Sequence, residues 1–129
     1  MRLNSPRCGV STRGAVQTGD NLMIGGFIVV SNPLKVIVRA TGPSLTAFGV
    51  AGAMADPTLE LRDANGTLIL ANDNWKDTQE AEITATGLQP SDQLESAILQ
   101  TLQVGLYTAL VRGKGDTPGV ALVEVYTLP

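Results

Sequence analysis

Residues 57–75, PTLELRDANGTLILANDNW, constrain the fold of this chain more than any other stretch. Leu59 and Leu61 alternate with polar residues, and Leu68 and Leu70 have the same spacing after a break. A period of two is typical of strands that bury one face. The break, DANG, offers an aspartate to start a turn and a glycine for a residue at positive φ. We therefore expect a hairpin here.

A four-residue loop at residues 63–66 would place Leu61 opposite Leu68 and Leu59 opposite Leu70, so that all four leucines share one face. A hairpin with one apolar face is not stable alone in water and needs a second layer to cover that face. The hairpin therefore predicts a fold of at least two packed layers.

The rest of the chain supplies further strands and many turns. Its 129 residues fit one domain. Its 14 glycines and 7 prolines indicate frequent turns, and its few aromatics leave an aliphatic core. We predict an all-β, antiparallel two-sheet β-sandwich of jelly-roll or Greek-key type. About eight strands are expected, namely the two arms of the hairpin and residues 15–18, 22–30, 34–40, 95–102, 106–112 and 120–128.

Two of these strands predict a second hairpin. Residues 22–30 are apolar on both faces, whereas residues 34–40 have Val36 and Val38 on one face. The stretch after them, residues 42–56, predicts an ordered loop with one helical turn, packed over the core through Leu45, Phe48, Val50 and Met54.

A polar stretch, residues 76–93, predicts a surface connection with room for one short helix. Residues 92–95 fit a helix capping box, but residues 95–102 fit a strand equally well.

Charge and residue types argue against several classes of function. The net charge is −3 and no basic cluster is present, so we expect no nucleic-acid partner. The chain has no histidine, and its single cysteine, Cys8, has no base beside it, so we expect no enzyme. No apolar run reaches the length of a membrane span. The start, MRLNSPRCGVS, lacks a signal region, which fits a cytoplasmic chain or a processed piece.

Hard oxygen ligands cluster after the hairpin. Asp73, Asn74 and Asp77 are the residue types that Ca²⁺ prefers, although their spacing is not that of an EF-hand. The alternative is that they shape a loop. Asn72 and Trp75 beside them suit a sugar-binding platform, but a lone tryptophan also suits a plug over the end of the sandwich.

Two charges interrupt apolar strands. If Arg39 and Glu124 lie on buried faces, each needs a partner. We predict a structural ion pair of Arg39 with Glu124 or with Glu60, and a loss of stability when either partner is removed.

The N-terminal residues 1–14 are polar and predict an arm outside the β-sandwich domain of residues 15–129. An open sandwich leaves strand edges that need protection. We therefore expect copies to associate into oligomers or filaments by β-augmentation, with assembly contacts from Arg2, Leu3, Cys8 and Val10. The alternative is a monomer whose arm folds back on its own sheet.

Four pieces of the chain resemble a module of many large bacterial secreted proteins, often near their ends. They are STRGAVQTGDNLMIGGFIV (11–29), VIVRATGPSLTAFGVAGAMADPTLELRDANG (36–66), ANDNW (71–75), and ESAILQTLQVGLYTALVRG with GVALVEVYTL (95–113 and 119–128). The second half is also similar to bacterial pre-peptidase C-terminal domains. Those domains are β-sandwiches with a hairpin that ends in an Asn-Asp-Asp-like run and a late Gly-x-Tyr-Thr strand. The matching residues are Asn72, Asp73, Asn74, Gly105, Tyr107 and Thr108.

This resemblance implies an extracellular or cell-surface location, an accessory role and, in some members, calcium. Because no catalytic domain accompanies the module in this sequence, a stand-alone role is favoured. We therefore expect a non-enzymatic, self-associating structural module. The alternative is an accessory carbohydrate- or calcium-binding domain of a secreted protein, with no cofactor other than Ca²⁺.

Overall fold

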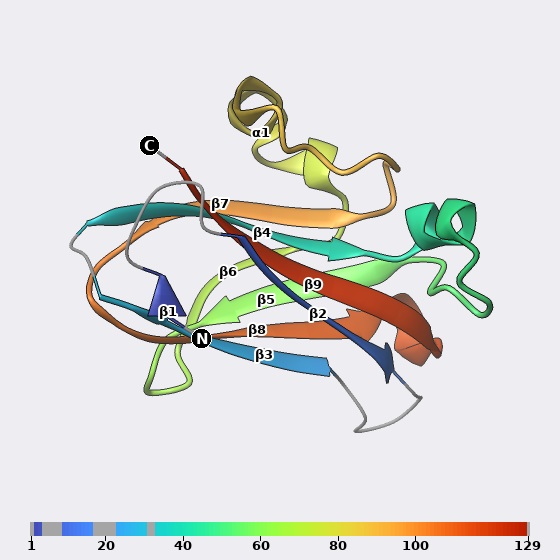
Figure 1. Ribbon diagram of the computed structural model, residues 1–129, viewed down its shortest axis with the longest axis horizontal. Helices are drawn as coiled ribbons and strands as arrows, with labels where there is room; N and C mark the ends of the chain where they lie inside the picture. Colours follow the sequence, from blue (N-terminus) through green and yellow to red (C-terminus); the bar gives the residue numbers. More distant parts are fainter. Residues whose placement is uncertain (1, 4–8, 17–22, 31–32, 129) are drawn as a thin grey trace.

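The computed structural model describes residues 2–3, 9–16, 23–30 and 33–128, which form two β-sheets packed face to face (Figure 1). The five-stranded sheet has the order β1 (Arg2–Leu3), β3 (Met23–Val29), β8 (Gly105–Gly113), β5 (Pro57–Arg62), β6 (Leu68–Asn72). The four-stranded sheet has the order β2 (Gly9–Val16), β9 (Gly119–Leu128), β4 (Leu34–Thr41), β7 (Ser96–Leu102). The short helices are η1 (Pro43–Phe48), η2 (Trp75–Asp77), α1 (Glu80–Thr86) and η3 (Lys114–Asp116).

The predicted all-β sandwich is confirmed. Neighbouring strands are antiparallel except β1 and β3, which pair in parallel over two residues. The described residues contain nine strands, where about eight were expected. The N-terminal residues account for the difference, because they supply β1 and most of β2. The domain boundary expected at residue 14 does not coincide with a break, since β2 runs from Gly9 to Val16.

The core lies between the sheets and is largely aliphatic, as the composition predicts. Val36 and Val38 of β4 are fully buried there. Tyr107 of β8 stacks on Phe27 of β3, with ring centroids 5.8 Å apart. Because side chains alternate along a strand, Ile37 of β4 points to the opposite side of its sheet and joins a second apolar cluster.

That second cluster lies on the outer face of the four-stranded sheet. Ile37, Ala97 and Leu99 of the sheet are covered there by Trp75 of η2 and Ile83 of α1. The predicted surface connection with one short helix is therefore also a lid on this face (Figure 1). Trp75 plugs the cluster and is 6% exposed.

The hairpin of residues 57–75 forms, but its predicted register is wrong. Leu61 lies opposite Leu70, and Leu68 lies opposite Arg62, with a bulge between the two pairs. Leu59 and Leu61 are fully buried, whereas Leu68 is 45% exposed. Asp63 and Thr67 close a three-residue loop through an Asp63 N–H bond to the Thr67 carbonyl, 3.0 Å. Two neighbouring residues of β5 thus face the three apolar residues LIL, 68–70, and the bulge accommodates the one residue of β6 that is in excess.

The second predicted hairpin is also wrong. β3 pairs with β8 and β4 pairs with β7 and β9, so β3 and β4 belong to opposite sheets. In the loop that follows β4, Leu45 and Met54 pack inward as expected, but Phe48 is 83% exposed.

Candidate functional site

The N-terminal strand β2 forms one edge of the four-stranded sheet, beside β9. Its pairing is continuous, from Gly9 opposite Tyr126 to Val16 opposite Gly119 (Figure 1). Arg2 and Leu3, in β1, lie opposite Ile28 and Val29 of β3. Val10 is in β2, and Cys8 is outside the described residues. The arm thus completes both sheets of its own chain.

Without β2, strand β9 would be an edge. Val123 and Val125 of β9 face the core and are 2% and 1% exposed, and Glu124 between them points outward and is 8% exposed. A strand that is buried on both faces behaves as an interior strand of a sheet. β9 therefore needs a neighbour on the side that β2 occupies.

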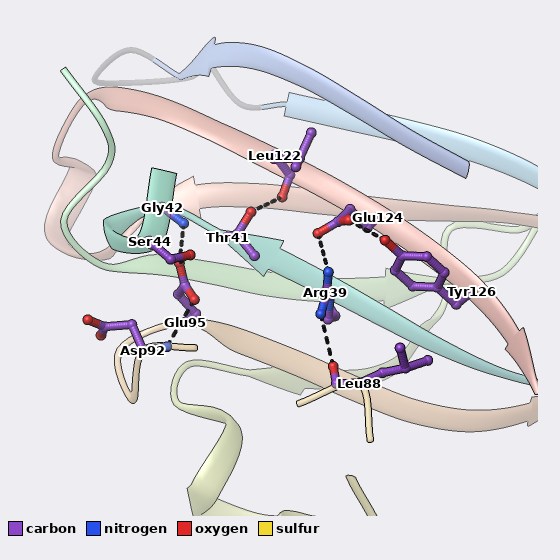
Figure 2. Close-up of polar contacts among 10 residues, drawn as sticks. All are labelled: Arg39, Thr41, Gly42, Ser44, Leu88, Asp92, Glu95, Leu122, Glu124 and Tyr126. Carbon is purple, nitrogen blue, oxygen red and sulfur yellow. Dashed lines mark hydrogen bonds and ion pairs between the residues drawn. The ribbon is translucent and has the colours of Figure 1, made fainter. Parts of the chain in front are cut away.

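The outer face of this sheet holds the interrupting charges that the sequence shows. Arg39 and Glu124 lie opposite each other on β4 and β9, with Nη2 of Arg39 2.7 Å from Oε1 of Glu124 (Figure 2). Nη1 of Arg39 donates to the Leu88 carbonyl at 3.1 Å. Tyr126 donates its hydroxyl proton to Glu124, and burial, followed by this bond, raises the pKa of Tyr126 above 10.0. Arg39 therefore forms its ion pair with Glu124, one of its two predicted partners.

Glu60 has a different partner. Its Oε1 accepts bonds from Arg62 two residues along β5, at 3.0 Å from Nε and 2.9 Å from Nη2. Both side chains are about one-third exposed, at 30% and 32%. Such a pair contributes little stability, because water screens it.

A cavity of about 490 Å³ opens beside the Arg39–Glu124 pair. Its wall combines apolar side chains from the η1 region with the polar ends of the ion pair. It is lined by Arg39, Thr41, Ser44, Leu45, Phe48, Val50, Pro90, Ser91, Leu122 and Glu124. Since the two charges already bind each other, the cavity is suited to an apolar group more than to an ion.

Glu95 is a structural residue that the sequence analysis missed. It is fully buried immediately before β7 and accepts backbone N–H bonds from Gly42 at 2.9 Å and Ser44 at 3.0 Å (Figure 2). The Ser44 hydroxyl donates to the same oxygen, and Asp92 N–H donates to the other at 3.2 Å. The signal was present in Gly-Pro-Ser, a turn whose N–H groups need an acceptor.

The predicted metal ligands lie near a lysine and a further aspartate. Asp73 binds Lys114 with Oδ2 2.7 Å from Nζ, and Asn74 Nδ2 donates to Asp77 at 3.3 Å. Burial, and then the neighbouring Asp73, raises the pKa of Asp56 above its ordinary 3.8. The bond to Asp73 raises the pKa of Lys114.

This cluster has hard oxygen donors, and Oδ1 atoms of Asp56, Asp73 and Asn74 are buried without a hydrogen-bond partner. However, Lys114 already supplies a positive charge to this cluster through its ion pair with Asp73. Within the described ranges, no group of three or more acidic, histidine or cysteine side chains is placed to hold a metal.

The predicted sugar-binding residues make internal contacts. Asn72 is 7% exposed, accepts the Ala97 N–H at 3.1 Å and donates to the Asn74 carbonyl at 3.0 Å and the Thr78 hydroxyl at 3.1 Å. Lys76 lies 5.5 Å from the centre of the Trp75 ring. Stacking on a sugar needs an open ring face, and Trp75 leaves little of its surface open.

None of the helices in the described part of the chain has the length and hydropathy to cross a membrane.

Comparison with known proteins gives a likeness of fold. No family model and no curated protein matches the sequence. Among solved structures, the pre-peptidase C-terminal domain of a collagenase from Bacillus anthracis matches with a TM-score of 0.56 and 12% identity. The match covers 96% of this chain and 91% of that chain. At this identity the likeness concerns the fold, and the chain is a β-sandwich distantly similar to bacterial pre-peptidase C-terminal domains.

Proposed function

We propose that this chain is a non-catalytic module of an extracellular protein that associates with copies of itself by exchanging its N-terminal strand. The observation that carries the proposal is the continuous antiparallel pairing of β2 with β9. The pairing is made by residues 9–16, and residues 17–22 connect them in sequence to β3, which belongs to the opposite sheet. If β2 paired with β9 of a second copy, it would form the same hydrogen bonds.

Exchange of an identical element costs little free energy, because the contacts are the same within one chain and between chains. Protein concentration then decides between them. A strand passed from each copy to the next is a head-to-tail contact, which extends into a chain of copies unless it closes into a ring. The structural role that we propose is that of the open form, a filament.

Two further facts support a non-catalytic, extracellular module. The chain lacks histidine, the commonest general base. One of the matching solved structures is a domain of a collagenase, and collagen is an extracellular protein.

Cysteine crosslinking tests the exchange. Ala15 of β2 lies opposite Val120 of β9, so a Cys8→Ser chain carrying Ala15→Cys and Val120→Cys can form a disulfide within or between copies. Oxidation over a range of protein concentrations should give a ladder of covalent oligomers on non-reducing gels. Light scattering should show a matching rise in mass.

The matched control places cysteines at Lys35 and Thr101, which lie opposite each other on β4 and β7. Those strands are not exchanged, so this pair should crosslink only within a chain. The proposal fails if the Ala15 and Val120 pair also gives only the monomer at every concentration.

A second candidate function, calcium binding, is favoured by the three unpartnered oxygens of Asp56, Asp73 and Asn74. An ion there would compete with Lys114 for Asp73. We expect Lys114→Met to make the thermal midpoint rise in Ca²⁺ relative to EDTA, because a ligand that binds the folded state stabilises it. An unchanged midpoint in this variant and in the parent would remove calcium from consideration.

A further inference from the structure

The edge of β3 that faces away from β8 points to a second contact between copies. β3 pairs with β8 along its full length, from Met23 opposite Val111 to Val29 opposite Gly105. On its other side β1 covers only the end of the strand, beside Ile28 and Val29. In the part of the chain that the structure describes, no strand pairs with residues 23–27 on that side. This edge lies at the lower margin of the molecule in Figure 1.

Residues 23–27 are apolar and lack the side chains that usually protect an edge strand. Their sequence, MIGGF, has no charge and no proline, the features with which edge strands commonly prevent pairing. Met23, Gly25 and Phe27 face the core, whereas Ile24 and Gly26 face outward. Ile24 is 60% exposed, and a Cβ built on Gly26 would meet no atom within 4 Å. The exposed side chain of Ile24 is therefore a knob, and the open space over Gly26 is a notch, two residues away on the same face.

We propose that the β3 edges of two copies pair antiparallel about a twofold axis that passes beside Gly25. In this register each Ile24 lies opposite Gly26 of the other copy, on the same face of the joined sheet. The side chain of Ile24 fills the open space over that glycine, between the partner's own Ile24 and its Ile28, which is 40% exposed. Met23 lies opposite Phe27 on the inner face, so the two cores meet.

A second copy is the occupant because the edge is complementary to itself. A twofold contact brings the same patch of both copies together, so every knob must find a notch at the symmetric position. Ile24 and Gly26 are placed symmetrically about Gly25. Within the described residues, β1 pairs with Ile28 and Val29, so it leaves Ile24 and Gly26 without a partner strand on that side of β3.

The inference extends the proposed self-association to a different edge and can fail separately from it. The oxidised, monomeric form of the Ala15→Cys, Val120→Cys chain has β2 fixed within its own sheet, so strand exchange cannot contribute. Sedimentation equilibrium of this fixed form should still show a reversible dimer. A monomer at all concentrations would overturn the inference and would leave the exchange of β2 untouched.

Two substitutions separate loss of the contact from loss of the fold. Ile24→Lys should weaken the dimer at least tenfold, since truncation or charging of an interface anchor commonly has that effect. Gly26→Val should weaken it similarly by filling the notch. Because the added side chain meets open space and valine favours strands, Gly26→Val should not lower the melting temperature.

The matched control is Leu68→Lys, the same kind of change at the opposite edge of the same sheet, where Leu68 is 45% exposed. It should leave the dimer unchanged. A dimer that survives Ile24→Lys, or that is lost equally in Leu68→Lys, contradicts the proposed edge.

The register has its own test. A chain with both Ile24→Lys and Gly26→Glu places opposite charges across the axis at both positions. It should dimerise again at low salt and dissociate as salt rises, because exposed ion pairs are screened. Failure of the double variant to recover at low salt would overturn the register about Gly25.

Discussion

The buried carboxylate of Glu95 allows a quantitative prediction from its hydrogen bonds. Oε2 accepts three bonds, from the N–H groups of Gly42 and Ser44 and from the Ser44 hydroxyl, and Oε1 accepts one from Asp92 N–H. The Glu95→Gln side chain has the same shape and can keep its carbonyl oxygen toward the three donors. Its NH₂ group must then face the Asp92 N–H, so one bond becomes a contact between two donors.

The expected cost follows from these bonds. A hydrogen bond to a charged group contributes about 1.5–3 kcal/mol. The three bonds that remain also weaken, because charge-assisted bonds are roughly twice as strong as neutral ones. We expect Glu95→Gln to lower the free energy of unfolding by about 3 kcal/mol, a large share of the ~5–15 kcal/mol of a typical domain. Ser44→Ala removes one donor of the four and should cost about 1 kcal/mol.

Urea denaturation followed by tryptophan fluorescence measures this loss. Trp75 is the single tryptophan, it is 6% exposed, and its backbone N–H donates to the carbonyl of Glu95 at 3.0 Å. The matched control is Glu82→Gln, the same change at an exposed position of α1, which should shift stability by less than ~0.5 kcal/mol. A Glu95→Gln variant as stable as this control would refute the reasoning.

Four further measurements test other contacts. Arg39→Met should lower stability by about 3 kcal/mol by leaving the buried Glu124 without its cationic partner, and adding Glu124→Leu should recover part of the loss; additive losses would contradict the pairing. Ultraviolet titration should show Tyr126 ionising above pH 10.0 and at lower pH in Glu124→Gln, and an unchanged titration would exclude the bond. The raised pKa of Asp56, caused by burial and a neighbouring carboxylate, means that the folded state holds this proton more tightly. Stability should therefore fall as pH rises from 3.8 through the raised value, and Asp56→Asn should flatten that fall. Gly42→Ala should destabilise the fold by about 2 kcal/mol, since the added carbon would lie 2.3 Å from a carbonyl oxygen, and a neutral result would show that the loop yields.

Local periodicity was sufficient to predict the two layers but not the partners of each strand. The burial of Val36 and Val38 could be predicted from the alternation within residues 34–40 alone. The separation of β3 and β4 into opposite sheets depends on β8 and β9, which lie far along the chain. A short turn between two strands fits a hairpin and a crossing between sheets equally well.

The register of the 57–75 hairpin failed for a related reason. Residues 68–70, LIL, are three apolar residues in a row, so the period of two does not say which of them faces inward. The bulge between Leu61 and Arg62 resolves this by placing Leu70, and not Leu68, opposite Leu61. Phe48 shows a further limit of sequence patterns. Its aromatic side chain suggests burial, but in this loop it is 83% exposed.

Among the site residues, the sequence identified polar groups in strands but not their neighbours. Arg39 and Glu124 stand out because each interrupts an apolar strand, so the need for a partner was visible. Glu95 did not stand out, because its donors come from Gly42 and Ser44, more than fifty positions earlier. Asp56 was missed for the same reason, since Asp73 and Lys114 reach it only in the folded chain.

The central place of β9 has a consequence for the order in which the protein can be made. β9 is C-terminal to every other described strand, yet it lies between β2 and β4 and joins them. During synthesis from the ribosome, or threading through a membrane pore, β2 emerges more than a hundred residues before the strand that receives it. Such distant pairing is slow to form. If copies exchange β2 as proposed, β2 can meet the β9 of a molecule finished earlier during that interval. Timing as well as concentration would then decide between a closed monomer and a growing chain of copies.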